Sequence, residues 1–84
     1  MVRIYIDKQC GYCKKLKEGL NKYNIKFTEV DVDLPSNERE TNKIFELAGE
    51  RVIPIITIKP HLLVPKKSFN TIDEAIGIIR NLTE

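Results

Sequence analysis

Two cysteines separated by two residues, Cys10 and Cys13, are the residues of this 84-residue chain best suited to chemistry. An apolar run over residues 2–6 precedes them, and a segment with helical periodicity follows from about residue 11 to 23. The unpaired N–H groups and the positive dipole end at a helix start favour an anion, so the first sulfur is expected to be a thiolate. The second sulfur lies about one turn later and can close a disulfide with the first. The spacing predicts a redox dithiol, with Cys10 as nucleophile and Cys13 as the resolving thiol.

A zinc site and a pair of cysteines without a role both have less support in the sequence. A structural zinc site needs four ligands, and beyond the two cysteines the chain offers only His61. Against surface cysteines without a role, three nearby lysines, Lys8, Lys14 and Lys15, would favour a thiolate at Cys10. We therefore expect redox chemistry and assign no role to His61.

The composition is that of an ordinary globular domain, with 42% hydrophobic and 31% charged residues. The net charge of +2 is too small to indicate nucleic-acid binding. No apolar run approaches the length that spans a bilayer, and no signal peptide is visible, so a cytoplasmic protein with no membrane partner is expected. In a reducing compartment a close pair of cysteines is more often catalytic than structural.

Periodicity and turn residues predict seven elements in the order β-α-β-α-β-β-α. The expected strands cover residues 2–6, 25–32, 52–58 and 62–64, and the expected helices cover about 11–23, 38–48 and 71–82. The predicted buried helix positions are Leu16, Leu20, Tyr23, Ile44, Phe45, Ala48, Ile72, Ala75, Ile76, Ile79 and Leu82. Gly49 is the expected end of the second helix, and Thr71 to Glu74 have the form of a capping box. This order predicts a single α/β domain over residues 1–84, with a four-stranded mixed sheet flanked by helices and the first two strands parallel.

Pro54 lies near the start of the most apolar segment of the chain. On the sequence alone a trans Ile53–Pro54 bond is favoured, because only about 5–6% of X–Pro bonds in folded proteins are cis. Pro65, which follows the last predicted strand, would remove a ladder donor and indicates an edge strand.

The chain resembles a glutaredoxin in three features taken together. These are the Cys-x-x-Cys between the first strand and the first helix, the Gly-x-Arg-x-Ile-Pro segment over residues 49–54, and the order of the elements. The aromatic Tyr12 between the cysteines adds to the resemblance, and we expect Tyr12 to be one of the substrate- or glutathione-binding residues. The resemblance implies a thioredoxin fold, reduction of protein disulfides or glutathione mixed disulfides, and a cis Pro54 that faces the active-site disulfide. It also implies that Ile53 binds the glutathione backbone and that Lys8 and Arg51 receive glutathione carboxylates.

The chain departs from the usual glutaredoxin pattern before its last helix. A glycine pair that binds the γ-glutamyl end of glutathione is replaced by Lys66-Lys67-Ser68-Phe69-Asn70-Thr71. Ser68, Asn70 and Thr71 are expected to offer hydroxyl and amide groups and a helix N-terminus in its place. The Ser-Phe pair is also similar to small redoxins that take electrons from thioredoxin reductase and serve ribonucleotide reductase. Both electron sources therefore remain open.

Gly11 raises an alternative from another class. Glutaredoxins with a small residue at this position resemble iron–sulfur carriers, in which two chains and two glutathiones hold one [2Fe–2S] cluster through the first cysteine, here Cys10. Such a cluster needs four thiolates, which one chain cannot supply. The resemblance thus allows a monomeric oxidoreductase or a cluster-bridged homodimer. Tyr5 is expected to be a strand residue without a role.

Overall fold

The computed structural model describes all 84 residues and places a four-stranded mixed sheet at the centre of the fold, in the order β2-β1-β3-β4. The strands are β1 (Val2–Ile6), β2 (Phe27–Asp31), β3 (Ile55–Ile58) and β4 (His61–Leu63). The helices are α1 (Gly11–Lys22), α2 (Glu38–Ala48) and α3 (Ile72–Thr83), with a short 3-10 turn η1 (Pro35–Asn37) before α2. The predicted α/β architecture and element order are confirmed.

The pairing of β1 explains how the sheet becomes mixed. It runs parallel to β2, with Val2 opposite Phe27 and Ile6 opposite Asp31, and antiparallel to β3. β4 pairs antiparallel with β3 at the other edge and ends two residues before Pro65, so it is the edge strand that the proline indicates. The register of β1 and β2 is unbroken, so the irregular alternation in residues 25–32 reflects a shorter strand and not a bulge.

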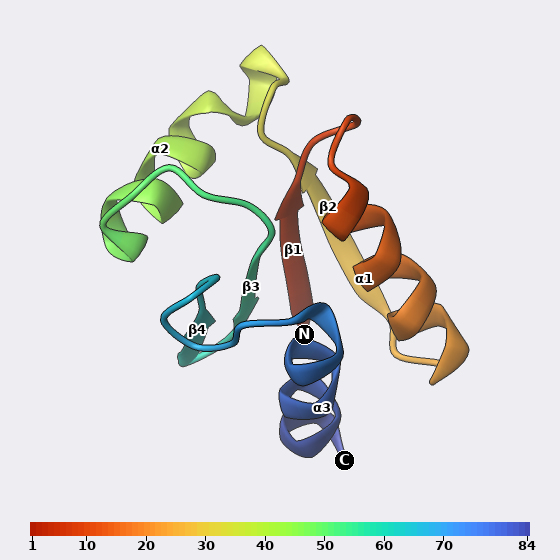
Figure 1. Ribbon diagram of the computed structural model, residues 1–84. Helices are drawn as coiled ribbons and strands as arrows, with labels where there is room; N and C mark the ends of the chain where they lie inside the picture. Colours follow the sequence, from red (N-terminus) through yellow and green to blue (C-terminus); the bar gives the residue numbers. More distant parts are fainter.

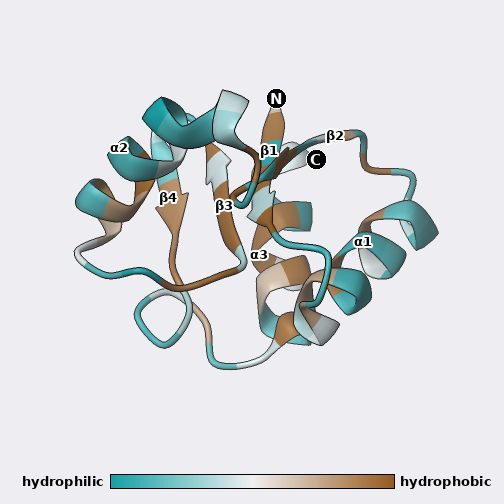
Figure 2. Cartoon of the chain, turned by 90° about the horizontal axis from the view of Figure 1, so that it is seen from above, coloured by the Kyte–Doolittle hydropathy of each residue, from teal (hydrophilic) through white to brown (hydrophobic).

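Alternation along β1 sends side chains to both faces of the sheet, and helices cover both faces (Figure 1). Ile4 and Ile6 face α1 and α3 in the larger core, whereas Tyr5 faces α2 in the smaller one. The other buried residues of the larger core are Val2, Cys13, Leu16, Leu20, Ile56, Ile58, Leu63, Phe69, Ile72, Ala75, Ile76 and Ile79. Those of the smaller core are Val30, Ile44, Phe45, Ala48, Ile55 and Val64. Figure 2 shows the same division, with hydrophobic strands inside and a hydrophilic outer surface on α2.

Several element boundaries differ from the sequence prediction. β3 begins at Ile55 and not at residue 52, and the Ile53–Pro54 bond that precedes it is cis. β2 begins at Phe27 because Asn24, with φ of 57°, turns the chain after α1. Tyr23 and Leu82, predicted to be buried, are 43% and 37% exposed. Both lie at helix ends, where less of the facing layer covers the side chain.

The expected helix termini are present. Gly49 follows α2 with φ of +81°, and its N–H donates to the Phe45 and Glu46 carbonyls. Thr71 and Glu74 form the predicted capping box at the start of α3. No helix is long and apolar enough to cross a membrane.

Candidate active site

Cys10 lies between the end of β1 and the first turn of α1, where it is the N-cap residue. Its Sγ accepts a hydrogen bond from the Cys13 N–H at 3.1 Å, and the two cysteines form a disulfide with a Cα–Cα distance of 5.2 Å. The first turn of α1 contains no acidic residue that would weaken the effect of the positive helix dipole end on this sulfur. The Cys10 sulfur therefore lies at the N–H groups and the positive dipole end of α1, the position that the predicted thiolate requires.

The two sulfur-bearing residues differ in exposure. Cys13 is only 1% exposed and belongs to the larger core, whereas Cys10 is partly exposed and packs against the edge of that core. An incoming disulfide can therefore reach Cys10 but not Cys13. This asymmetry matches the division into an attacking and a resolving cysteine.

A cavity of about 620 Å³ opens beside the disulfide on the side of β2. Lys8 and Lys14 line it together with both cysteines, and neither lysine makes an ion pair in the chain. Lys17, also on its wall, is paired with Glu29 at 2.9 Å. The third nearby lysine of the sequence prediction, Lys15, instead lies 3.9 Å from Asp73 on α3. Lys8 and Lys14 are thus the unpaired cations next to the redox centre.

A second cavity of about 290 Å³ brings together five of the predicted binding residues from three separate segments. We call it the proline groove; the five are Tyr12, Ile53, Pro54, Asn70 and Thr71, joined by Glu50, Val52, Pro65, Lys66, Phe69 and Ile72. Tyr12, 70% exposed, extends the groove to the Cys-x-x-Cys segment. The Ile53–Pro54 bond on the groove wall is cis. The groove thus adjoins the Cys-x-x-Cys segment through Tyr12, while neither cysteine lines it.

Arg51 and Ser68 do not line either cavity. The Arg51 guanidinium lies 4.9 Å from the centroid of the Phe45 ring on α2. The Ser68 hydroxyl accepts the Val64 N–H at 3.0 Å and donates to the Leu62 carbonyl, so it closes the turn after β4. Both side chains are engaged within the fold.

The N-terminus of α3 is also engaged by the chain itself. The Glu74 carboxylate accepts hydrogen bonds from the Asn70 N–H at 3.1 Å and the Thr71 N–H at 3.0 Å. The Thr71 hydroxyl in turn accepts the Glu74 N–H at 3.1 Å. Asp73 adds a second negative charge to this turn. Two backbone donors at this helix start, the Asn70 and Thr71 N–H groups, are therefore bonded to Glu74, although the sequence prediction assigned these two residues to a ligand.

A polar network on the other face of the sheet was not predicted from the sequence, which gave Tyr5 no role. The Tyr5 hydroxyl donates to the Glu40 carboxylate at 2.9 Å, and the Arg3 guanidinium donates to the same oxygen. The bond from Arg3 holds the pKa of Glu40 below its ordinary value, and burial raises the pKa of Tyr5. Arg3 and Tyr5 are two apart on one strand and so share a face, but nothing local connects them to Glu40. The network anchors α2 to β1.

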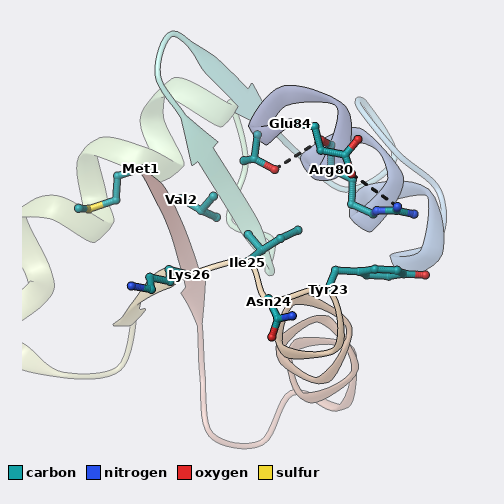
Figure 3. A pocket seen from close by; sticks show the side chains of 9 residues that line it. Met1, Val2, Tyr23, Asn24, Ile25, Lys26, Arg80 and Glu84 are labelled. Atoms are coloured by element: carbon teal, nitrogen blue, oxygen red, sulfur yellow. Dashed lines mark hydrogen bonds and ion pairs between the residues drawn. The ribbon is translucent and has the colours of Figure 1, made fainter.

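A further hollow of about 400 Å³ lies at the start of β1, at the opposite end of this strand from the cysteines (Figure 3). Tyr23 and Arg80 line it, with the Arg80 guanidinium 4.1 Å from the Tyr23 ring centroid and 3.5 Å from the Glu84 carboxylate. None of the predicted site residues lies in it.

The residues of one chain do not fit a metal centre. No group of three or more His, Cys, Asp or Glu side chains is placed to hold a metal ion. Cys10 is the one partly exposed sulfur of the cysteine pair, and a [2Fe–2S] cluster needs four thiolates.

Comparison with known proteins identifies the family. A family model described as glutaredoxin matches residues 2–63. An uncharacterised glutaredoxin-like 8.6 kDa protein in the rubredoxin operon of Clostridium pasteurianum is 34% identical over 64 residues, which cover 76% of this chain and 83% of that protein. The glutaredoxin-like protein NrdH of Lactococcus lactis subsp. cremoris is 33% identical over 57 residues, 68% of this chain and 75% of the relative.

Solved structures agree on the fold. A glutaredoxin from Archaeoglobus fulgidus superposes with a TM-score of 0.72 at 17% identity, covering 94% of this chain and 85% of that one. The buckwheat glutaredoxin–glutathione complex gives 0.70 at 14% identity, covering 95% and 68%. These likenesses establish a thioredoxin fold. The chain belongs to the glutaredoxin family, as a dithiol redox protein of the Cys-x-x-Cys type.

Proposed function

We propose that this protein is a dithiol–disulfide oxidoreductase that reduces protein disulfides. The Cys10 thiolate attacks one sulfur of the substrate disulfide, which forms a mixed disulfide and releases the other substrate sulfur as a thiolate. Cys13 then loses its proton and attacks Cys10, which releases the second substrate thiolate and leaves the Cys10–Cys13 disulfide. Two electrons pass from the dithiol to the substrate, and an external reductase must return them.

The observation that carries this proposal is the position of the Cys10 sulfur. It is partly exposed, caps α1 and accepts the Cys13 N–H, while Cys13 is buried one turn away. The same N–H is placed to stabilise the Cys10 thiolate each time it leaves a disulfide. Lys8 and Lys14 on the wall of the neighbouring cavity bring positive charge to this side of the disulfide, where the Asp7 and Asp31 carboxylates also lie.

The Glu74 carboxylate at the start of α3 favours a protein disulfide over glutathione as the substrate. Glu74 takes the Asn70 and Thr71 N–H groups, and its negative charge opposes a ligand carboxylate at the end of the proline groove. The Lactococcus relatives are named NrdH, which supports ribonucleotide reductase as a protein partner and thioredoxin reductase as the electron source. A reducing cytoplasm is the compartment in which this cycle would run.

A coupled assay tests the proposal. The oxidised protein is supplied with NADPH and either thioredoxin reductase or glutathione plus glutathione reductase, and reduction of insulin disulfides is followed. We expect faster turnover with thioredoxin reductase. Activity in neither system would refute the oxidoreductase, and faster turnover with glutathione would refute the substrate preference.

Two cysteine variants test the assigned roles. Cys10→Ser should abolish all turnover, because no other residue supplies the attacking thiolate. Cys13→Ser should lose insulin reduction but retain turnover of a glutathione mixed disulfide, which needs one thiol only. The reverse result would exchange the nucleophile and the resolving cysteine.

A cluster-binding carrier is a second proposal, because of the open space at Gly11. A Cβ placed on Gly11 meets no atom within 4 Å, so the surface beside Cys10 is free for the approach of a second copy. A second chain and two glutathiones would have to supply the remaining thiolates. Anaerobic reconstitution with iron, sulfide and glutathione should then give a coloured dimer that Gly11→Pro does not form. Wild-type protein that stays monomeric and colourless would exclude the carrier.

A further inference from the structure

We propose that Lys67 is a positioning residue that ties together the two walls of the proline groove and thereby sets the binding of protein substrates. This inference rests on the proposed function, since it assigns the substrate to that groove. One wall is the segment 50–54, which contains Pro54, and the other is the segment 65–72. Lys67 lines neither cavity, so it acts through the walls and not on the substrate.

The Lys67 ammonium bridges the two segments directly. It donates a hydrogen bond of 2.5 Å to the Ala48 carbonyl and lies 3.5 Å from the Glu50 carboxylate. These partners flank Gly49, where α2 ends and the Pro54 segment begins. One side chain from the second wall thus holds the base of the first.

The positive charge of Lys67 stabilises the C-terminal end of α2. The last carbonyls of a helix carry partial negative charge and lack partners within the helix, and a basic side chain near them is stabilising. α2 has no basic residue in its own last turn. Lys67, 19 residues further along the chain than Ala48, supplies the missing charge.

Little space remains between Gly49 and the Lys67 ammonium. Gly49 has φ of +81°, and a Cβ built on it would lie 3.2 Å from the Lys67 Nζ. Glycine at this position therefore satisfies both the left-handed backbone and the approach of the ammonium.

The loop that carries Lys67 is itself tightly bonded. The Lys66 N–H donates to the Phe69 carbonyl at 2.7 Å, and the Lys67 and Ser68 N–H groups donate to the Val64 carbonyl at 3.1 and 2.8 Å. The Ser68 hydroxyl adds its bond to the Val64 N–H. These bonds fix the Lys67 backbone relative to β4. The contacts of its side chain with Ala48 and Glu50 then hold the start of the Pro54 segment in place relative to β4.

Kinetics on two substrates test the inference. Lys67→Met should raise KM for insulin roughly three- to tenfold, the range expected for losing one charge-assisted contact at a partly exposed position. The value of kcat, and the rate with the small disulfide 5,5′-dithiobis(2-nitrobenzoic acid), should stay unchanged, because Cys10 is untouched. Lys67→Arg, which can donate to the same two partners, should restore most of the affinity. Lys43→Met is the matched control, because Lys43 lies on α2 and makes no ion pair.

Hydrogen exchange separates this inference from the proposed function. In Lys67→Met the amides of residues 49–54 and 65–70 should exchange faster than in wild type and in Lys43→Met, whatever the enzyme reduces. Unchanged exchange, or an insulin KM equal to that of Lys43→Met, would overturn the role of Lys67. If wild type and Lys43→Met also fail to reduce insulin, the result instead refutes the proposed oxidoreductase activity.

Discussion

The contact between α1 and α3 can be tested with two glycine substitutions that make the same chemical change in different surroundings. Gly19 is in α1, and a Cβ placed there would lie 2.1 Å from Cδ1 and 3.1 Å from Cγ1 of Ile76 on α3. Gly77 is in α3, and a Cβ placed there meets nothing within 4 Å. Because α1 has Cys10 at its start, this contact helps to set where the redox centre lies.

The expected magnitudes follow from two opposing effects. Alanine is favoured over glycine in a helix by about 1 kcal/mol, so Gly77→Ala should stabilise the fold by up to that amount. Gly19→Ala gains the same propensity but overpacks the buried Ile76, which costs about 1–3 kcal/mol. The free energy of unfolding of Gly19→Ala should therefore lie about 1–3 kcal/mol below that of Gly77→Ala.

Urea unfolding of the oxidised protein, followed by far-ultraviolet circular dichroism because the chain has no tryptophan, gives these free energies. Ile76→Val removes Cδ1, so Gly19→Ala should be better tolerated in that background, with a coupling energy of about 0.5–3 kcal/mol. Equal stabilisation by both alanines, or additive effects of Gly19→Ala and Ile76→Val, would refute the predicted clash between the new Cβ and the Ile76 side chain.

Three further predictions concern stability. Thr71→Ala removes the acceptor of the Glu74 N–H and should cost about 1 kcal/mol in urea unfolding; no change would mean that the cap is dispensable. Leu16→Ala empties a fully buried position in α1 and should cost about 2–5 kcal/mol, and a loss below about 1 kcal/mol would contradict its place in the core. The depressed pKa of Glu40 beside Arg3 contributes stability above the ordinary value of 4.5, and this contribution is lost as pH falls through the depressed value. The stability difference between wild type and Glu40→Gln should therefore narrow on acidification, and a constant difference would argue against the ion pair.

Local features could be predicted from the sequence because their partners lie within one helical turn. The Cys10–Cys13 pairing, the helix that starts at Cys10, the left-handed end of α2 at Gly49 and the capping box of α3 all depend on residues at most four apart. The order of elements followed from hydrophobic periodicity. The glutaredoxin resemblance was read from the same short segments, and the family match confirms it.

The assembly of the site depended on contacts between distant segments. Tyr12, Pro54 and Asn70 are far apart in the chain, and the fold brings them to one groove, whereas it leaves Arg51 and Ser68 outside it. Neither residue type nor local spacing determines which side chains meet after the sheet is packed.

The same reason explains the contacts that could not be predicted from the sequence. Lys67 bonds the Ala48 carbonyl 19 residues away, and Arg3 bonds Glu40 37 residues away. In the sequence, Lys67 follows Lys66 and resembles an ordinary surface charge. Only the fold shows that the end of α2 lies against its ammonium group. The sequence alone thus determined the redox dithiol and its helix, because both are local. The walls of the groove and the residues that hold them depend on long-range packing, which only the tertiary structure decided.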